Sequence, residues 1–283
     1  MLELNKTYND QQKVFDELLF GSGVVVFRDI FELKKIKEAR NIINHFADNQ
    51  EQKETHFNAE AESSGKIHLQ QRVWNLFDKS EIFSELITSD LIFELMGKFL
   101  GSEFFCGSYC ASRLLPGASG QEMHLDYPYW DYYKSETFPI GLNSSFPQNC
   151  QVTIPLDECS ALSGATGYIP GSQKNLHYPN ENDDLSKIKQ MIGNPGDIIF
   201  FNGNCWHGAM PNKSNNQRAA ILIEFLPKYI KPVEDLVSYL DTLFKKNASD
   251  RVKQLLGLKY PYPKIMDVSK SVNDIGIGYK SKN

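Results

Sequence analysis

A series of short β-rich runs between Glu103 and Leu226 constrains the fold of this chain more than any other feature of the sequence. The runs are separated by Pro, Gly and Asn, and they read FFCGSYCASRLL, NCQVTIPL, GATGYI, GDIIFF and RAAILIEF. Short strands with turn residues between them are typical of antiparallel sandwiches and barrels. The segment therefore predicts a mainly β core at about 101–227.

Helical patterns precede this core. Apolar residues recur at helical spacing in Asn9–Phe20, Glu32–Phe46 and Ile82–Leu100, so these segments are expected to be helical. A short strand is expected over Gly23–Phe27, where β-branched residues follow one another. The charged stretch Asp48–Gly65 nearly lacks large apolar residues. It is expected to be an exposed loop or lid.

The part of the chain after the core predicts two more helices, in EDLVSYLDTLFKK and SDRVKQLLGL within 232–260. A chain of 283 residues, 41% of them hydrophobic, is long enough to bury one large core. The simplest partition is a single catalytic domain over 1–283. A helical and strand segment at 1–100 and the C-terminal helices then flank the β core, which makes the overall class α+β and mainly β.

The charge balance and the cysteines argue against several classes of function. The formal net charge is −5 and the pI is about 5.7, so no broad cationic surface is expected for nucleic acid or anionic lipid. No long uncharged apolar run occurs, and MLELNKTYND does not resemble a signal peptide, which favours a cytoplasmic protein without a membrane segment. The cysteines form no CxxC pair, which argues against disulfides and structural zinc. We expect a small-molecule partner and a monomer or homodimer.

Three residues form a candidate metal site. His124 and Asp126 lie two positions apart in QEMHLDYPYWD, so in an extended segment their side chains leave the same face. His207 lies 83 residues after His124, in GDIIFFNGNCWHGAMPN, directly after a strand signal. Two imidazoles and one carboxylate are the ligand set that leaves open positions on non-haem iron(II). A bidentate co-substrate and O2 need those open positions.

Arg218 completes this constellation. It lies 11 residues beyond His207, in NKSNNQRAAILIEF, where the polar NKSNNQ turn is expected to fold the next strand back beside the strand of His207. A guanidinium grips a carboxylate through a fork of charge-assisted hydrogen bonds. We therefore expect Arg218 to anchor the distal carboxylate of a co-substrate bound at the metal.

The order HLD, GATGYIPGSQK and PGDIIFFNGNCWHGAMPNKSNNQR resembles the phytanoyl-CoA dioxygenase (PhyH) family of iron(II)- and 2-oxoglutarate-dependent oxygenases, over roughly Gly101–Pro227. The resemblance implies a double-stranded β-helix, or jelly roll, as the fold of the core. It also implies that iron(II) is bound by His124, Asp126 and His207. Arg218 would then bind the C5 carboxylate of 2-oxoglutarate. The implied reaction consumes O2, releases succinate and CO2, and most simply hydroxylates a C–H bond.

Two positions depart from the family's pattern. Gln173 stands where the family usually has His, and Ala209 stands where some members place a Ser near the co-substrate. Neither is a metal ligand, so the implied iron site is unaffected. Asp126 is informative in its own right, because the halogenating relatives carry Gly or Ala there. We therefore expect hydroxylation or a related oxidation over halogenation.

Further residues are candidates for contacts with the co-substrate or the substrate. Gln121 and Arg113 are candidates for contacting 2-oxoglutarate. Thr166 is a candidate for the same pocket, although packing in a strand explains a β-branched residue equally well. Three aromatic residues follow the HLD motif: Tyr127, Tyr129 and Trp130. They are expected either to form one wall of the substrate pocket or to pack under a loop.

Two other classes of function use the same residues. A metal-dependent hydrolase holds zinc through three protein ligands and a water, and a jelly-roll binding protein keeps the metal without turnover. Arg218 and the jelly-roll spacing favour the oxygenase. The preferred substrate is a small polar metabolite or natural product, and the fold does not select one.

Overall fold

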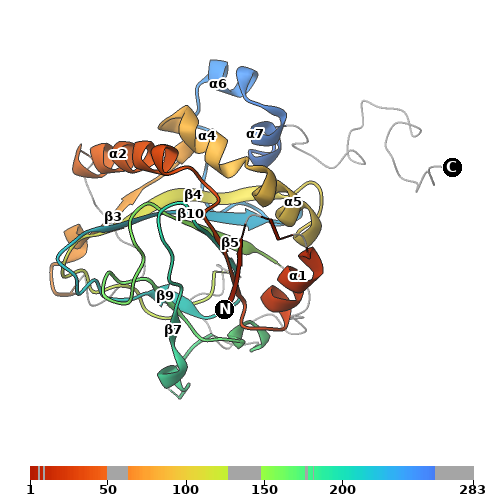
Figure 1. The fold of residues 1–283 in the computed structure, drawn as a ribbon. Helices are drawn as coiled ribbons and strands as arrows, with labels where there is room; N and C mark the ends of the chain where they lie inside the picture. The colour runs from red at the N-terminus through yellow and green to blue at the C-terminus, as the bar shows by residue number, and fades with distance from the viewer. Residues whose placement is uncertain are drawn as a thin grey trace.

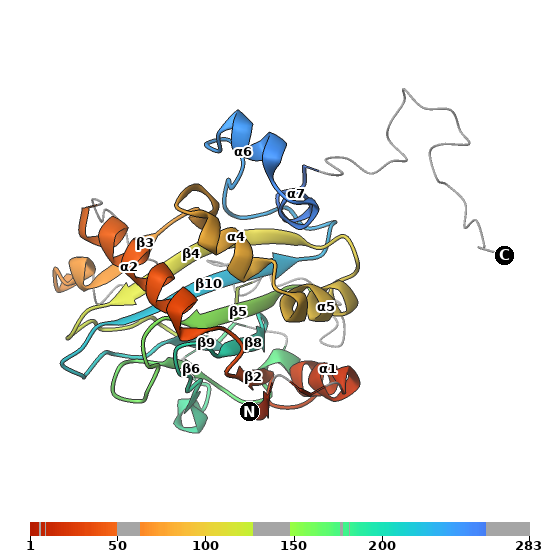
Figure 2. The same cartoon turned by 45° about the horizontal axis from the view of Figure 1, so that its top comes forward.

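Two β-sheets form the centre of the fold, and helices cover the outer face of the larger sheet. The computed structural model describes residues 1–5, 7–8, 10–49, 63–126, 148–175, 178–180 and 182–258. Figure 1 shows α2, α4 and α5 lying across one face of the larger sheet, with β7 and β9 on its other side. The same three helices lie over this sheet in the turned view of Figure 2.

The larger sheet has seven strands in the order β1-β2-β8-β5-β10-β4-β3, and the smaller one has the order β7-β6-β9. The strands of the larger sheet, in chain order, are β1 Leu2–Asn5, β2 Val24–Arg28, β3 Gln70–Val73, β4 Phe105–Leu114, β5 Cys150–Pro155, β8 Ile198–Asn202 and β10 Arg218–Leu226. The strands of the smaller sheet are β6 Thr166–Tyr168, β7 Lys189–Gln190 and β9 His207–Ala209. This arrangement is the expected double-stranded β-helix with helical additions. The first hundred residues contribute β1, β2 and β3 to its larger sheet.

The helices are α1 Gln11–Leu19, α2 Leu33–Asn49, α4 Glu81–Ile87, α5 Asp90–Phe99, α6 Thr242–Asn247 and α7 Asp250–Leu255. The helical spacing over Ile82–Leu100 belongs to two helices, since α4 ends before Thr88 and α5 begins after Ser89. Asp90 lies in the first turn of α5, where a negative charge favours a helix start. Within the described residues, no helix has the length and apolar character needed to cross a membrane.

Strand alternation divides the side chains of the larger sheet between two environments. In β4 and β10, one set of side chains packs with the helices in the main core: Tyr109, Ala111, Ile221 and Ile223. The alternate set lines a cavity between the sheets: Ser108, Cys110, Leu222 and Glu224. Because successive side chains of a strand point to opposite faces, the position of a residue along β4 or β10 decides whether it can reach the cavity.

Glu234 fixes the segment that follows β10. Its carboxylate accepts hydrogen bonds from the backbone N–H of Asn75 at 2.7 Å, the hydroxyl of Ser108 at 2.8 Å and the backbone N–H of Tyr109 at 2.9 Å. Its own backbone N–H donates to the carbonyl of Gly107. The long helix expected in EDLVSYLDTLFKK is therefore wrong in its first half, because these residues are held against β4 and the helix begins only at Thr242.

Loss of the Glu234 carboxylate should destabilise the fold. We expect Glu234→Ala to lower the free energy of unfolding by about 2–4 kcal/mol, because it removes three hydrogen bonds to a mostly buried charged group. Glu85→Ala is the control, since its carboxylate is exposed and pairs only with Lys35 at the surface. Urea unfolding followed by circular dichroism measures both, and equal stability losses would contradict the role of Glu234.

Candidate active site

His124 and His207 lie side by side because their backbones are paired. Each residue donates its N–H to the carbonyl of the other at 2.8 Å, which forms an isolated antiparallel bridge. The two imidazole ring centres are 4.5 Å apart. Asp126 follows two positions after His124, and its N–H donates to the carbonyl of Gly203 at 3.1 Å. Residues that lie 83 positions apart in the sequence thus meet at one point.

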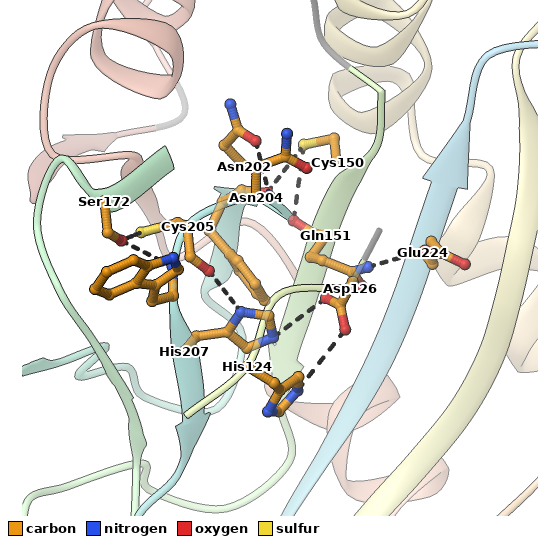
Figure 3. A network of polar contacts seen from close by, with 12 residues as sticks. His124, Asp126, Cys150, Gln151, Ser172, Asn202, Asn204, Cys205, His207 and Glu224 are labelled. Carbon is orange, nitrogen blue, oxygen red and sulfur yellow. Dashed lines mark hydrogen bonds and ion pairs between the residues drawn. The ribbon is translucent and has the colours of Figure 1, made fainter. Parts of the chain in front are cut away.

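Asp126 faces both imidazoles (Figure 3). One carboxylate oxygen lies 3.2 Å from Nε2 of His207 and the other lies 3.8 Å from Nε2 of His124. One ligand atom from each of the three residues lies within 4.8 Å of the others. Among the residues that the structure describes, no fourth His, Cys, Asp or Glu joins this group. Three ligands on one side are the arrangement that leaves open coordination positions.

The protonation state of both imidazoles fits a metal site. Nδ1 of His124 lies 2.7 Å from the carbonyl of Glu122, and Nδ1 of His207 lies 2.8 Å from the carbonyl of Cys205. A carbonyl only accepts, so each Nδ1 carries a proton, and Nε2 is the ring nitrogen on the side of Asp126, where it can bind a metal once it carries no proton. Metal-bound histidines are oriented in this way by a hydrogen bond from the other ring nitrogen.

The electrostatics of the site differ between the two imidazoles. Burial and, next, the neighbouring His207 lower the pKa of His124 to about 4, so this imidazole is neutral near pH 7. Burial opposes ionisation of both other groups, yet the contact between them lowers the pKa of Asp126 and raises that of His207. The Asp126 carboxylate is thus available as a charged ligand.

A cavity of about 310 Å³ opens beside these residues. It lies between the two sheets, and its wall is mostly apolar with a few charged groups. Besides the three residues, its lining includes Arg72, Trp74, Ser108, Gln121, Gln151, Thr166, Phe201, Leu222, Val233, Glu224 and Glu234. The size and the few polar groups suit a small-molecule site.

Arg218 begins β10 and is 2% exposed. Its Nη2 donates to the carbonyl of Gly164 at 2.5 Å, and its Nε is buried without a hydrogen-bond partner. Burial lowers the pKa of this guanidinium, although Arg remains charged in proteins. A buried guanidinium with an unsatisfied N–H requires an acceptor, and a carboxylate supplies one. Arg218 does not line the cavity itself.

The structure separates the candidate co-substrate residues. Gln121 and Thr166 line the cavity as expected. Arg113 does not line the cavity, so the expectation that it contacts 2-oxoglutarate is wrong. Its side chain leaves the opposite face of β4 from that of Ser112 and points toward the helices. There its Nε donates to Gln71 at 2.6 Å, and its other nitrogens donate to Asn44 and Asp48 of α2. The three aromatic candidates, Tyr127, Tyr129 and Trp130, lie outside the described residues.

The sequence patterns did not identify several residues that line the cavity. Glu224 could have been identified from the sequence, because it lies six positions after Arg218 and so shares the face of Arg218 in an extended strand. Arg72 and Trp74 carried no such signal, since β3 joins the edge of the sheet from a distant part of the chain. The departure Gln173 has a packing role, and its amide donates to the carbonyl of Gly21 at 3.1 Å at the end of α1.

Known proteins show similarity to this chain over most of its length. The sequence profile described as Phytanoyl-CoA dioxygenase (PhyH) matches residues 21–220. A relative in Alternaria alternata, Dioxygenase ALT11, is 24% identical over 252 residues, which are 86% of this chain and 80% of that protein. Among solved structures, HygX from Streptomyces hygroscopicus with nickel and 2-oxoglutarate bound has a TM-score of 0.57 at 14% identity, covering 82% of this chain and 92% of that one.

A further solved structure is the epimerase SnoN in complex with Fe³⁺, α-ketoglutarate and nogalamycin RO, with a TM-score of 0.58 at 12% identity. The match covers 77% of this chain and 83% of that one. HygX was also solved with hygromycin B bound, again with a TM-score of 0.57. At these identities the solved structures establish that the fold is shared.

Gly208 should be essential for the geometry of the site. A Cβ at this position would lie 2.7 Å from the carbonyl oxygen of Glu122, the group that orients the His124 ring. We expect Gly208→Ala to push the two histidine segments apart and to weaken iron(II) binding about 10–100-fold while the protein stays folded. Gly97→Ala, with nothing within 4 Å of the added methyl, is the control. Anaerobic iron titration measures both, and unchanged affinity in Gly208→Ala would contradict the bridge geometry.

Proposed function

Because this chain belongs to the phytanoyl-CoA dioxygenase family and is a 2-oxoglutarate-dependent dioxygenase, we propose that His124, Asp126 and His207 hold its iron(II). The observation that carries the proposal is the pair of Nδ1 bonds to backbone carbonyls, which leaves both Nε2 atoms directed at Asp126. Iron(II) in such a site supplies the reduction of O2, coupled to decarboxylation of 2-oxoglutarate and oxidation of the substrate.

The protein's own contribution is orientation and exclusion of water. The carbonyls of Glu122 and Cys205 fix the two rings, so little reorganisation is needed when the metal binds. Phe201 packs edge-on against the His207 ring, with ring centres 4.8 Å apart, and shields it from solvent. Gln121 and Thr166 border the cavity on the side of the smaller sheet and are available for contacts with the co-substrate.

Arg218 is proposed to hold the distal carboxylate of 2-oxoglutarate. It faces the same side of β10 as Leu222 and Glu224, and its unsatisfied Nε and its position behind Gly164 suit an anionic group that enters from the cavity. Such a charge-assisted contact fixes the direction in which 2-oxoglutarate lies. It also leaves the opposite end of the cavity for the substrate.

The proposed reaction is hydroxylation of an unactivated C–H bond in a small metabolite or natural product, with release of succinate and CO2. The cavity volume and the small molecules bound by HygX and SnoN support this class of substrate. Asp126 supports oxidation over halogenation, because it fills the metal position that a halide would need.

The first test is binding of the co-substrate. We expect Arg218→Met to weaken 2-oxoglutarate binding about a hundredfold, equivalent to about 2.7 kcal/mol, while iron(II) affinity stays unchanged. The measurement is an anaerobic titration of the apoprotein with both components, followed by the visible charge-transfer band of the iron chelate. The wild-type protein should show a band that requires both iron(II) and 2-oxoglutarate.

Two results would contradict the proposal. A wild-type protein that binds zinc tightly and shows no band would favour a hydrolase or a binding protein. Full 2-oxoglutarate affinity in Arg218→Met would remove the role of that residue alone. Oxygen uptake coupled to succinate formation separates the dioxygenase from both alternatives.

A further inference from the structure

We propose that Asp157 is a positioning residue for 2-oxoglutarate, because its carboxylate holds the chain on both sides of Arg218. The inference deepens the proposed function and rests on it, since Arg218 is the residue proposed to bind the distal carboxylate of 2-oxoglutarate. Asp157 is not among the described residues that line the cavity, and its side chain is 14% exposed. It therefore acts through the position that it gives to Arg218.

Arg218 begins β10 at a point where strand pairing is incomplete. It pairs with β4, whereas the pairing of β10 with β5 begins only at Ala220. Past the end of β5, the N–H groups of Leu156 and Asp157 both donate to the carbonyl of Ala219, at 3.0 and 3.1 Å. These bonds bring the Asp157 side chain next to the first residues of β10.

The carboxylate of Asp157 completes the pairing at this point. One of its oxygens, Oδ2, accepts hydrogen bonds from the backbone N–H of Ala219 at 2.9 Å and from the side-chain amide of Gln217 at 3.2 Å. These two residues directly follow and directly precede Arg218. A single oxygen atom therefore constrains the main chain of Arg218 from both directions.

Helix α2 holds the same carboxylate and the Gln217 amide from the outer face of the sheet. Arg40 forms an ion pair with the other oxygen of Asp157, Oδ1, at 2.5 Å. Asn44 accepts a hydrogen bond from the Gln217 amide at 3.0 Å. Arg40 and Asn44 lie four positions apart and so share one face of the helix. The position of Arg218 thus depends on contacts that reach back to α2.

Strand alternation places this anchor and the Arg218 side chain on opposite faces of the sheet. Ala219 packs in the main core with the helices, whereas Ala220 packs with Ala165 on the other face, which Arg218 shares. There the guanidinium donates to the carbonyl of Gly164. The anchor therefore fixes the main chain and leaves the Nε of Arg218, which is buried without a hydrogen-bond partner, for an incoming carboxylate.

The geometry of this anchor determines which property depends on it. A charge-assisted contact between a guanidinium and a carboxylate depends on direction, and such a binding group must be held within about 0.5 Å of its productive position. Loss of Asp157 releases the start of β10 and so weakens binding of 2-oxoglutarate. His124, Asp126 and His207 are positioned by separate main-chain hydrogen bonds. Iron(II) binding should therefore be spared.

The test is an anaerobic titration of the iron(II) enzyme with 2-oxoglutarate, followed by the visible charge-transfer band. We expect Asp157→Ala to weaken 2-oxoglutarate binding about tenfold, with iron(II) affinity changed less than about twofold. Asp157→Asn keeps an acceptor for the Ala219 N–H and should restore the affinity to within about threefold of wild type.

Gln217→Ala removes only the contact that precedes Arg218. We expect it to weaken 2-oxoglutarate binding about threefold. If Asp157→Ala does not fold, this variant decides the matter, and wild-type affinity in Gln217→Ala then overturns the proposal.

Asp197 offers a matched control at the start of β8, which lies two strands from β10 in the larger sheet. Its buried carboxylate likewise pairs with an arginine, Arg28, at 2.7 Å. It also accepts hydrogen bonds from the backbone N–H groups of Asp29 and Asn194, at 3.0 and 2.8 Å. Asp197→Ala should lower stability in urea at least as much as Asp157→Ala does, yet bind 2-oxoglutarate with wild-type affinity.

Coupling to Arg218 separates positioning from a general loss of structure. In the Arg218→Met background, Asp157→Ala should cause no further loss of 2-oxoglutarate affinity, because the residue that it positions no longer binds the carboxylate. Additive losses in the double variant, or wild-type affinity in a folded Asp157→Ala protein, would overturn the proposal. When Arg218→Met weakens binding and Asp157→Ala does not, only the role of Asp157 fails. Normal binding in Arg218→Met removes the proposed role of Arg218 and that of Asp157 with it.

Discussion

The backbone bridge between His124 and His207 is the interaction on which the rest of the site depends. It joins the first residue of the HLD motif to β9 and brings the two imidazole ring centres to 4.5 Å from each other. The same two segments supply the carbonyls that fix the ring nitrogens. Gly208 has no side chain where these backbones approach each other, and Gly203 positions Asp126. The proposed metal ligands are thus placed by main-chain hydrogen bonds, which position them without a bound ion.

Strand alternation distributes the chemistry around this centre. On β10 the side chains that pack against the helices form the main core, while the alternate row carries Arg218 at one end and Glu224 at the other. Arg218, the proposed contact of 2-oxoglutarate, is therefore in the same row of β10 as the cavity residues Leu222 and Glu224. The helices on the outer face keep this strand fixed, because its outward residues are completely buried among them. Rigid positioning of a binding group favours binding of its ligand in one orientation.

Much of the fold could be predicted from local sequence patterns. The β-rich runs predicted a mainly β core, and the motifs around HLD and the distal His implied the family and its jelly roll; the structure and the relatives confirm both the fold and the family. The spacing of HxD and the distal His also predicted that His124, Asp126 and His207 come together, whereas the role of Arg218 stays a prediction. The prediction that Arg113 contacts 2-oxoglutarate was wrong because only one of the two faces of a strand borders the cavity. Arg72 and Glu234 could not be found, since their contacts join distant parts of the chain.

The most direct test of this account is a crystal structure of the anaerobic protein with iron(II) and 2-oxoglutarate, with anomalous data at the iron edge. The account predicts one iron bound by Nε2 of His124, Nε2 of His207 and a carboxylate oxygen of Asp126, with 2-oxoglutarate extending from the iron to Arg218. An iron with a fourth protein ligand, or one bound elsewhere in the chain, would contradict it. So would 2-oxoglutarate directed toward Glu224.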